Sequence, residues 1–430
     1  MLDINLIRND PDKVREGLAR KGCDVDLGAF LLEDRRRREL IQSGETLKAE
    51  RNRASGQIPT LRREGIDTSA LLADMKKISE RIKAIDEELA AVEKSQQVFL
   101  DGLPNLPADG VPAGGKENNQ VVSTFGERPS FSFEPRHHVE LVERLGIIDY
   151  VRGAKLGGNG YWLYRGDGAR LERALLSYLM AEHHKDGDEM ILPQHILTWD
   201  CGYTAGQFPK FAEDVFQIRD EESEQGFTRF LLPTSETALV NLYRDEVIEV
   251  AQLPVKLYAY SPCYRREAGS YRADERGMIR GHQFNKIEMF QYTLPQDSDR
   301  AFQELIGKAS ALMEGLGLHH RISRLAAEDC SASMRETYDI EVWIPSMNGY
   351  KEVSSASNAG DYQARRGNIK YRDPLTGKLD FVHTLNASGL ATSRILPALV
   401  EQFQLADGSV VIPEVLRPYL GGQEKLTPKQ

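Results

Sequence analysis

Residues 261–290 read SPCYRREAGSYRADERGMIRGHQFNKIEMF and contain the most informative pattern in the chain. Two apolar segments flank a polar loop with three glycines, which predicts a strand, a loop and a returning antiparallel strand. Side chains alternate along a strand, so Arg265 and Glu267 are expected on one face. Phe284, Lys286 and Glu288 are expected to share a face of the returning strand. A guanidinium, carboxylates and an aromatic ring would then meet on one surface of a sheet.

The loop between these strands carries Arg272, Arg276 and Arg280, which suit it to closing over phosphate. An ordinary charged hairpin with cross-strand ion pairs is the alternative. The order of the residues favours phosphate, because RxE, a loop, RG, HQF and KIE resemble motif 2 of the class II aminoacyl-tRNA synthetases, in the version of the seryl-tRNA synthetases. The resemblance implies an α+β fold in which an antiparallel sheet is flanked by helices.

The same resemblance implies roles for the residues of the stretch. Arg265 would hold the α-phosphate of ATP, with Arg266 beside it in the nucleotide site. Glu267 would read the adenine amino group and Phe284 would stack on the adenine ring. Glu288 would contact the substrate serine. The strand geometry shows only that these roles are possible.

Composition limits the class of protein. The 430 residues, 40% of them hydrophobic, can form two or three domains with a large core. No apolar run approaches the length of a membrane helix, and the charged start MLDINLIRND lacks the apolar core of a signal peptide, so a cytoplasmic protein is expected.

Four scattered cysteines predict neither disulfides nor a zinc site. No P-loop or dinucleotide fingerprint occurs, and the net charge of −10 confines any RNA contact to a local basic patch.

The N-terminal region, residues 1–100, predicts a short helix starting near Pro11 and then a helical hairpin. A seam of apolar residues repeats at alternating spacings of four and three, at Leu71, Met75, Ile78, Ile82, Ile85, Leu89 and Val92. The partner helix is expected at about 29–56, interrupted by Gly44, and the stretch 58–69, IPTLRREGIDTS, is expected to reverse the chain. The simplest arrangement is an antiparallel coiled coil.

Basic residues gather on the first helix of this hairpin. They include Arg35, Arg36, Arg37, Arg38, Lys48, Arg51 and Arg53. A solvated helix face is one interpretation. The other is an arm that follows phosphates, which needs only positioned cations. Seryl-tRNA synthetases carry such an N-terminal hairpin along the long variable arm of their tRNA, and this resemblance favours the second interpretation.

Residues 101–136 are rich in Pro, Gly and polar residues and are expected to be a linker. A catalytic domain is expected at 137–422, with helices near 138–145 and 168–184, followed by a tail at 423–430. The second helix leads into ILPQHI, which resembles motif 1 with Pro193 as its proline. Because motif 1 forms the dimer interface of class II enzymes, the resemblance implies a homodimer.

The segment FLLPTSETALV at 230–240 predicts a strand, a turn and a helix. Thr234 or Ser235 could simply cap that helix. In the family the TxE triplet lines the amino-acid pocket, so the resemblance implies that Thr234, Ser235 and Glu236 bind serine. A cap and a pocket wall are compatible.

The segment EVWIPSMNGYKEVSS at 341–355 predicts a pair of strands. Glu352 and Ser355 offer hard oxygen ligands for Mg²⁺, which takes one or two protein oxygens plus substrate phosphate. A glutamate on a solvated strand face is the alternative. KEVSS matches the metal and ATP segment of the family, which also implies that Val353 and Ser354 border ATP.

The segment HTLNASGLATSRILPALVE at 383–401 resembles motif 3. Arg394 would reach the γ-phosphate, and Ser388 would contact serine. Three positions depart from the family pattern, namely Ala205 in place of Thr, Ala387 in place of Gly and Ser393 in place of Gly. Extra atoms near ATP could narrow the site, so these departures concern the choice of substrate and not the fold.

The expected function is therefore a ligase with two steps, in which serine and ATP give seryl-adenylate and the seryl group passes to the 3′ end of tRNA. Mg²⁺ is the expected cofactor. Two alternatives remain open. One is a paralogue that activates another small amino acid or a serine analogue, or that loads a carrier protein. The other is a nonenzymatic binding protein on a synthetase scaffold.

Overall fold

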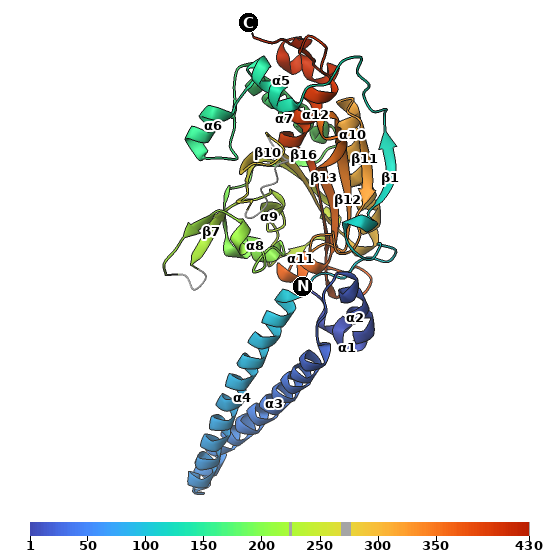
Figure 1. Ribbon diagram of the computed structural model, residues 1–430. Helices are drawn as coiled ribbons and strands as arrows, with labels where there is room; N and C mark the ends of the chain where they lie inside the picture. Colours follow the sequence, from blue (N-terminus) through green and yellow to red (C-terminus); the bar gives the residue numbers. More distant parts are fainter. Residues whose placement is uncertain (223–225, 268–276, 430) are drawn as a thin grey trace. The chain divides into compact units, whose positions relative to one another are not determined.

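The computed structural model describes residues 1–222, 226–267 and 277–429 (Figure 1). The chain forms two compact units, one made of residues 2–19 and 23–103, the other of residues 1 and 20–22 and the chain from 104 onward. Of the three loop arginines, Arg272 and Arg276 lie outside the described residues, whereas Arg280 lies within them.

The first unit is built from helices, α1 (Ile4–Asn9), α2 (Pro11–Arg20), α3 (Leu27–Arg63) and α4 (Ser69–Gly102). Phe30 of α3 stacks on Phe99 of α4 with ring centroids 5.0 Å apart. Farther along, Lys48 pairs with Asp86 at 2.9 Å. Residue numbers thus rise on α3 as they fall on α4, and the predicted antiparallel hairpin is confirmed.

The reversal between these helices is shorter than the predicted stretch 58–69. Helix α3 continues through Pro59 to Arg63, so only residues 64–68 form the turn. Proline lacks an N–H and removes one helical hydrogen bond. Pro59 is exposed, however, and water can satisfy the carbonyl group that loses its partner. Gly65, with φ of +74°, supplies the left-handed residue that ends the helix.

An eight-stranded sheet forms the centre of the second unit, in the order β1-β11-β12-β13-β16-β10-β9-β4. Its strands are β1 (Gln120–Phe125), β4 (Glu189–Ile191), β9 (Val255–Tyr264), β10 (Gln283–Thr293), β11 (His320–Arg324), β12 (Glu336–Ile344), β13 (Gly349–Gly360) and β16 (His383–Ala391). All neighbours pair antiparallel except β4 and β9, which are parallel. The predicted antiparallel sheet is confirmed.

Strand β1 lies inside the stretch 101–136 that composition predicts as a linker. It pairs with β11 from Gln120↔Arg324 to Phe125↔His320. The pairing is with a strand about 200 residues away in the chain, so no local pattern of prolines and glycines could indicate it. The stretch therefore contributes one edge of the sheet.

Helices α5 (His138–Leu145), α7 (Asp167–Lys185), α10 (Ser298–Gly315) and α12 (Thr392–Gln402) form a group with the sheet's longer strands (Figure 1). Their apolar side chains join those of the sheet in one core, which includes Leu175, Phe302 and Leu396 from the helices and Ile287 and Met289 from β10. Alternate residues of β10, Phe290 and Tyr292, enter a second core. Strand β10 is therefore buried on both faces.

The remaining elements are short. The helices are α6 (Tyr150–Gly157), α8 (Trp199–Thr204), α9 (Glu236–Leu239) and α11 (Tyr362–Arg366), and the 3₁₀ turns are η1 (Lys116–Asn118), η2 (Ala212–Asp214), η3 (Val250–Gln252), η4 (Pro295–Asp297), η5 (Pro345–Met347) and η6 (Glu414–Leu420). The small sheets contain β2 (Ile148–Asp149), β3 (Leu163–Tyr164), β5 (Ile196–Thr198), β6 (Gln217–Arg219), β7 (Phe227–Leu231), β8 (Val247–Ile248), β14 (Lys370–Arg372), β15 (Leu379–Phe381), β17 (Val410–Val411) and β18 (Lys425–Leu426). Among the described residues, none of the helices combines the length and apolar content that crossing a bilayer requires.

Replacing Gly44 by alanine is expected to stabilise α3. A β-carbon at Gly44 would lie 3.5 Å from Cγ2 of Ile85, an ordinary contact. Alanine also favours a helix over glycine by about 1 kcal/mol. Amide hydrogen exchange within α3 should slow about fivefold, the factor to which that free energy corresponds.

Gly28→Ala is the matched control for this substitution. A β-carbon at Gly28 would lie 2.9 Å from Oδ1 of Asp26, the residue that caps α3. Exchange at the start of α3 should therefore become faster. An unchanged amide exchange rate in Gly44→Ala would mean that Gly44 does not lower the stability of α3.

Candidate functional site

Two neighbouring cavities open beside the ends of β9 and β10. The larger, of about 430 Å³, is lined by residues that include Ala205, Gln207, Thr234, Glu236 and Met334. The smaller, of about 40 Å³, is lined by residues that include Phe284, Lys286, Glu352, Ser388, Ser393 and Arg394. Arg265 and Glu267 line both cavities. The structure thus brings together most of the predicted site residues from four separate segments.

Arg265 follows directly after β9, and its side chain lies between the two cavities. Its Nε donates to the carbonyl oxygen of Pro233 at 3.2 Å. Its guanidinium carbon lies 5.3 Å from the centre of the Phe284 ring, at cation–π distance. The remaining N–H groups of the planar fork can serve an anionic ligand.

Glu267 reaches the same place by a different route from the predicted one. Strand β9 ends at Tyr264, and Glu267 has φ of +48°, so strand alternation does not extend to it. Arg280, from the far end of the loop, donates to Oε2 of Glu267 at 2.5 Å. The ion pair, rather than a regular strand, therefore holds this carboxylate.

A buried network of charges lies on β10. Glu288 is fully buried, and its Oε2 lies 2.5 Å from Nζ of Lys286, two residues earlier on the same face as predicted. Nζ of Lys286 also donates to the hydroxyl of Thr234 at 2.7 Å, and Thr234 donates to Oε2 of Glu288 at 3.3 Å. Asn386 donates to Oε1 of Glu288 at 3.0 Å. The carboxylate is thus fully hydrogen-bonded, which burial of a charge requires.

Glu236 is a second buried carboxyl group near this network. Burial and repulsion from Glu288 raise its pKa to about 7, partly offset by the hydrogen bond from Gln363. That bond, from Nε2 of Gln363 to Oε1 of Glu236, is 2.7 Å long. Gln363 is itself held by Thr384, whose hydroxyl donates to Oε1 of Gln363 at 2.7 Å. Two carboxyl groups and one ammonium favour a ligand that brings a positive charge.

Ser235, the middle residue of the predicted triplet, lines neither cavity. It is fully buried, and its hydroxyl lies 2.6 Å from the hydroxyl of Ser261 on β9. This bond ties the turn that carries Thr234 and Glu236 to the sheet.

A β-bulge in β13 aligns the predicted metal ligands. The register with β12 shifts between Ile340↔Ser354 and Glu341↔Glu352, which leaves Val353 as the extra residue. In a regular strand Glu352 and Ser355 would face opposite ways, because they are three residues apart. With the bulge both are partly exposed, while Val353 between them is buried.

Ser355 and Glu352 offer oxygens that fit a divalent cation. The hydroxyl of Ser355 donates to Oδ1 of Asp339 at 2.7 Å, so its lone pairs stay available. Burial and the carboxylate of Glu352 raise the pKa of Asp339 well above its ordinary value. Ser354, in contrast, is buried, and its hydroxyl donates to the carbonyl oxygen of Ser388 at 2.6 Å.

Arg394 lies in the first turn of α12 and reaches across to β13. It donates from NH1 to the carbonyl oxygen of Glu352 at 2.7 Å and from Nε to that of Ile279 at 3.4 Å. Its guanidinium is 3.5 Å from the carboxylate of Glu352. Arg266, in contrast, is exposed, lines neither cavity and donates to the carbonyl oxygen of Glu213 at 2.8 Å.

Comparisons with known proteins agree with this geometry. The seryl-tRNA synthetase N-terminal domain matches residues 1–107, and the class II tRNA synthetase core domain of the G, H, P, S and T enzymes matches residues 216–403. Serine–tRNA ligase 2 of Clostridium acetobutylicum is 58% identical over 98% of this chain and 99% of its own length. The chain belongs to the seryl-tRNA synthetase family.

Further members of the seryl-tRNA synthetase family match equally completely. The serine–tRNA ligase of Nitratidesulfovibrio vulgaris is 43% identical over 99% of this chain and 100% of its own. Seryl-tRNA synthetase from Pyrococcus horikoshii complexed with ATP has a TM-score of 0.92 at 30% identity, over all of both chains. The cytoplasmic serine–tRNA ligase of Naegleria fowleri with AMP has a TM-score of 0.88 at 27% identity, over 100% of this chain and 99% of that one. The predicted family is confirmed.

The three departures from the seryl-tRNA synthetase pattern occupy different surroundings. Ala387 is fully buried in the main core. Ala205 lines the larger cavity, and its carbonyl oxygen accepts from Gln363 at 3.1 Å. Ser393 lines the smaller cavity next to Arg394. Only Ala205 and Ser393 can therefore touch a ligand directly.

Several site residues escaped the sequence patterns of the seryl-tRNA synthetases. Asn386 lies inside a recognised motif, but its burial beside Glu288 could not be predicted from the motif. Strand alternation placed Lys286 on the face of Glu288, but did not show that the two form a buried ion pair. Gln363 and Asp339 lie outside those motifs, and only the packing of α11 and the register of β12 with β13 bring them in. No local spacing indicates either one.

The hairpin of this family member carries two kinds of basic residue. Arg36 pairs with Glu88 at 2.7 Å, Arg37 with Glu93 at 3.0 Å, Arg38 with Asp34 at 3.3 Å and Lys48 with Asp86 at 2.9 Å. Arg35, Arg51 and Arg53 have no acidic partner among the residues that the structure describes. Arg36, Arg37 and Lys48 pair with acids on α4 and so join the two helices, whereas Arg38 pairs within α3. The second kind leaves its charge to solvent.

Removing the carboxyl group of Glu236 should stabilise the protein in a pH-dependent way. The folded-state pKa of about 7 exceeds the ordinary 4.5, so the folded protein retains a proton that the unfolded chain releases. Folding stability from this group is complete below pH 4.5 and is lost as the pH rises through about 7.

Glu236→Gln should therefore raise the unfolding temperature little near pH 4.5 and most above pH 7. The glutamine still accepts the hydrogen bond from Gln363. Thermal unfolding of parent and variant across this range, without serine, measures the difference. A difference independent of pH would contradict the raised pKa.

Proposed function

We propose that the two cavities bind serine and ATP next to each other, with Arg265 where the serine carboxylate meets the α-phosphate. The observation that supports this most is that Arg265 lines both cavities. The reaction is the ligation of serine to tRNA in two steps. A serine carboxylate oxygen attacks the α-phosphorus of ATP, and pyrophosphate leaves with the electron pair of the broken bond. The seryl group then passes to a hydroxyl of the terminal ribose of tRNA, and AMP leaves.

Little acid–base chemistry is required, because the serine carboxylate is already a nucleophile. Catalysis then depends on alignment with the α-phosphorus and on cations placed where negative charge develops. Arg265 holds the α-phosphate and Arg394 the γ-phosphate. Phe284 stacks on adenine and Glu267 accepts from its amino group. Arg266 borders the nucleotide from the exposed side.

Serine binds in the larger cavity, near the buried carboxyl groups. Its ammonium offsets the charges of Glu236 and Glu288. Thr234 offers a hydroxyl partner from the same cavity, and Ser388 offers one from the adjoining smaller cavity. Ser235 supports the turn from behind through Ser261. A site that hydrogen-bonds a substrate hydroxyl leaves buried groups unpaired when alanine binds, which disfavours alanine strongly.

Glu352 and Ser355 hold Mg²⁺ in this proposal, with Val353 and Ser354 shaping the strand that carries them. The donor set consists of hard oxygens, which Mg²⁺ prefers, and leaves room for phosphate oxygens and water. When bound, the ion neutralises phosphate charge. Asp339 keeps the Ser355 hydroxyl turned so that its lone pairs remain accessible.

The hairpin binds tRNA through its basic residues, and the enzyme acts in the cytoplasm as a homodimer through the segment that includes Pro193. In terms of domains, residues 1–100 form the tRNA-binding arm region, and 101–136 lead from it to a catalytic domain at 137–422 while adding strand β1 to its sheet. Residues 423–430 form a tail. A paralogue specific for another small amino acid differs in one measurable way, since alanine, glycine or threonine would then support pyrophosphate exchange as well as serine. A nonenzymatic binder would not need Arg265, Arg394 and Glu352 together.

Arg265→Ala and Arg394→Ala should each abolish most serine-dependent pyrophosphate exchange. Losing one charged donor from a transition-state site costs about 2.7–4 kcal/mol, or 10²–10³-fold in rate. Arg372→Ala is the matched control, because Arg372 is exposed, lines neither cavity and donates to the carbonyl oxygen of Gly377. Exchange within threefold of the parent in both site variants would overturn their assignment.

Neutralising Arg35, Arg51 and Arg53 to glutamine should weaken tRNA binding and its dependence on salt. Each lost phosphate contact lowers the slope of log K against log salt by roughly 0.7–0.9, so the triple variant should lose about 2. The triple variant of Arg36, Arg37 and Lys48 should lose less, because their charges are already paired. Equal slopes for parent and first variant would leave the arm without a role in phosphate binding.

A further inference from the structure

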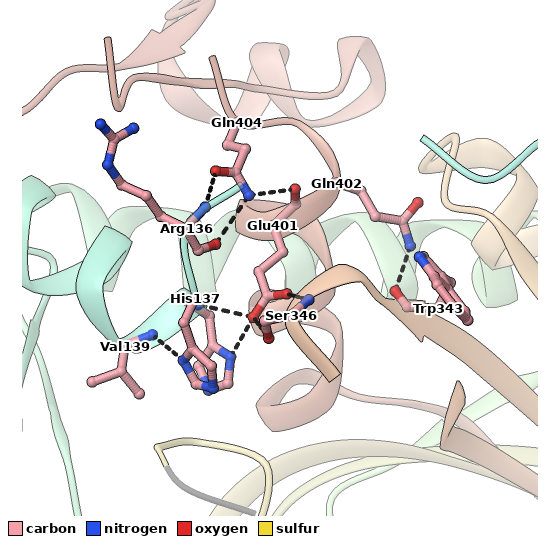
Figure 2. A network of polar contacts seen from close by, with 9 residues as sticks. Arg136, His137, Val139, Trp343, Ser346, Glu401, Gln402 and Gln404 are labelled. Atoms are coloured by element: carbon pink, nitrogen blue, oxygen red, sulfur yellow. Dashed lines mark hydrogen bonds and ion pairs between the residues drawn. The ribbon is translucent and has the colours of Figure 1, made fainter. Parts of the chain in front are cut away.

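A buried histidine–glutamate pair, of which Glu401 is labelled in Figure 2, lies at the opposite end of α12 from Arg394. His138 begins α5 and Glu401 lies in the last turn of α12, and both side chains are fully buried. Nδ1 of His138 lies 2.6 Å from Oε1 of Glu401, and the backbone N–H of His138 donates to the same oxygen at 2.8 Å. The pair is not part of either cavity.

The surroundings of Glu401 fix the orientation of the imidazole ring. Ser346 donates to Oε2 from its backbone N–H and to Oε1 from its hydroxyl, each at 2.8 Å. Burial alone would raise the pKa of Glu401, but hydrogen bonds from His138 and Ser346 lower it below the ordinary value. The carboxylate can only accept, so Nδ1 of His138 carries its hydrogen. Nε2 consequently points away from Glu401.

The Nε2 side of the His138 ring lies against Gly277, which precedes β10 in the chain. A β-carbon on Gly277 would lie 2.6 Å from Nε2 of His138 and 2.7 Å from Cγ2 of Val139. Gly277 has φ of +83°, a conformation that side chains disfavour. The absence of a side chain here thus allows the backbone to pack directly on the imidazole.

The three residues after Gly277 connect this contact to the nucleotide site. Met278 is fully buried and Ile279 is 4% exposed. The carbonyl oxygen of Ile279 accepts from Arg394, and Arg280 forms the ion pair with Glu267. One short backbone segment, residues 277–280, therefore supports both the adenine-binding carboxylate and the γ-phosphate arginine.

We propose that His138 is a positioning residue for ATP, which acts by fixing the backbone of residues 277–280 while Glu401 fixes the ring of His138. The proposal rests on the ATP roles of Glu267 and Arg394 given above. His138 touches neither substrate. Its effect should fall on ATP and not on serine, because the serine-binding groups Thr234 and Glu288 are held by Lys286 and Asn386 instead.

The test uses His138→Asn in the full-length chain. The asparagine amide can occupy the place of Nδ1 and donate to Glu401, but it lacks the part of the ring that meets Gly277. In serine-dependent pyrophosphate exchange we expect KM for ATP to rise about tenfold, while KM for serine stays within about twofold, since small misplacements of a binding group reduce rates by such factors.

Gln402→Leu is the matched control. Gln402 adjoins Glu401 and donates to the carbonyl oxygen of Trp343 at 2.8 Å (Figure 2). It also donates to the carbonyl oxygen of His319 at 3.3 Å. This variant should lower the unfolding temperature without changing KM for ATP. The same KM for ATP in both variants would mean that His138 only stabilises the end of α12, and the proposal would fall.

Gly277→Ala gives an independent measurement from the other side of the contact. It should also raise KM for ATP selectively, and its effect should be less than additive with that of His138→Asn, because both disturb one contact. Additive effects would contradict the proposal. If the parent protein shows no serine-dependent pyrophosphate exchange, the proposed function is wrong. That failure is distinct from the failure of the role proposed for His138.

Discussion

Burial of two carboxyl groups beside one lysine is the constraint around which the catalytic unit is arranged. Removing such charges from water costs several kcal/mol each unless every lone pair and proton finds a partner. Strand β10 carries Lys286 and Glu288 between two neighbouring strands, and the turn with Thr234 approaches from β7. Asn386 approaches from β16 and Gln363 from α11. The buried charges thus take partners from a neighbouring strand of the sheet and from elements outside the sheet.

Irregular backbone does much of the remaining placement. The bulge in β13 turns Glu352 and Ser355 to one side, and a shift in the register of β10 with β16 sets Ser388 opposite Glu288. Glu267 owes its place to a left-handed residue conformation and one ion pair. Such features cost conformational energy, so they persist only where the surrounding strands determine them. A regular sheet with the same residues would scatter the site over two faces.

Local patterns in the sequence were sufficient to predict most helices and strands and the main site residues. They could not predict features that depend on pairing between distant parts of the chain. The apolar seam from Leu71 to Val92 and the motif around Arg265 follow from neighbours in the chain. Strand β1, Asp339 and Gln363 depend on partners about 16 to 200 residues away, which no local period encodes. The predicted reversal at 58–69 began too early, because Pro59 is a strong local helix breaker that the exposed end of α3 nevertheless accommodates. Arg266 shares its motif with Arg265 but is exposed and donates to the carbonyl oxygen of Glu213, outside both cavities.

The ion pairs across the hairpin have a consequence for length. Because Arg36, Arg37 and Lys48 each pair with a specific acid on α4, the two helices cannot slide past one another without separating opposite charges. A straight helix of 37 residues extends roughly 55 Å at 1.5 Å per residue. The length over which the hairpin extends is therefore fixed. Only paired insertions of about seven residues in each helix, adding ~10 Å, would change that reach and keep the seam in phase.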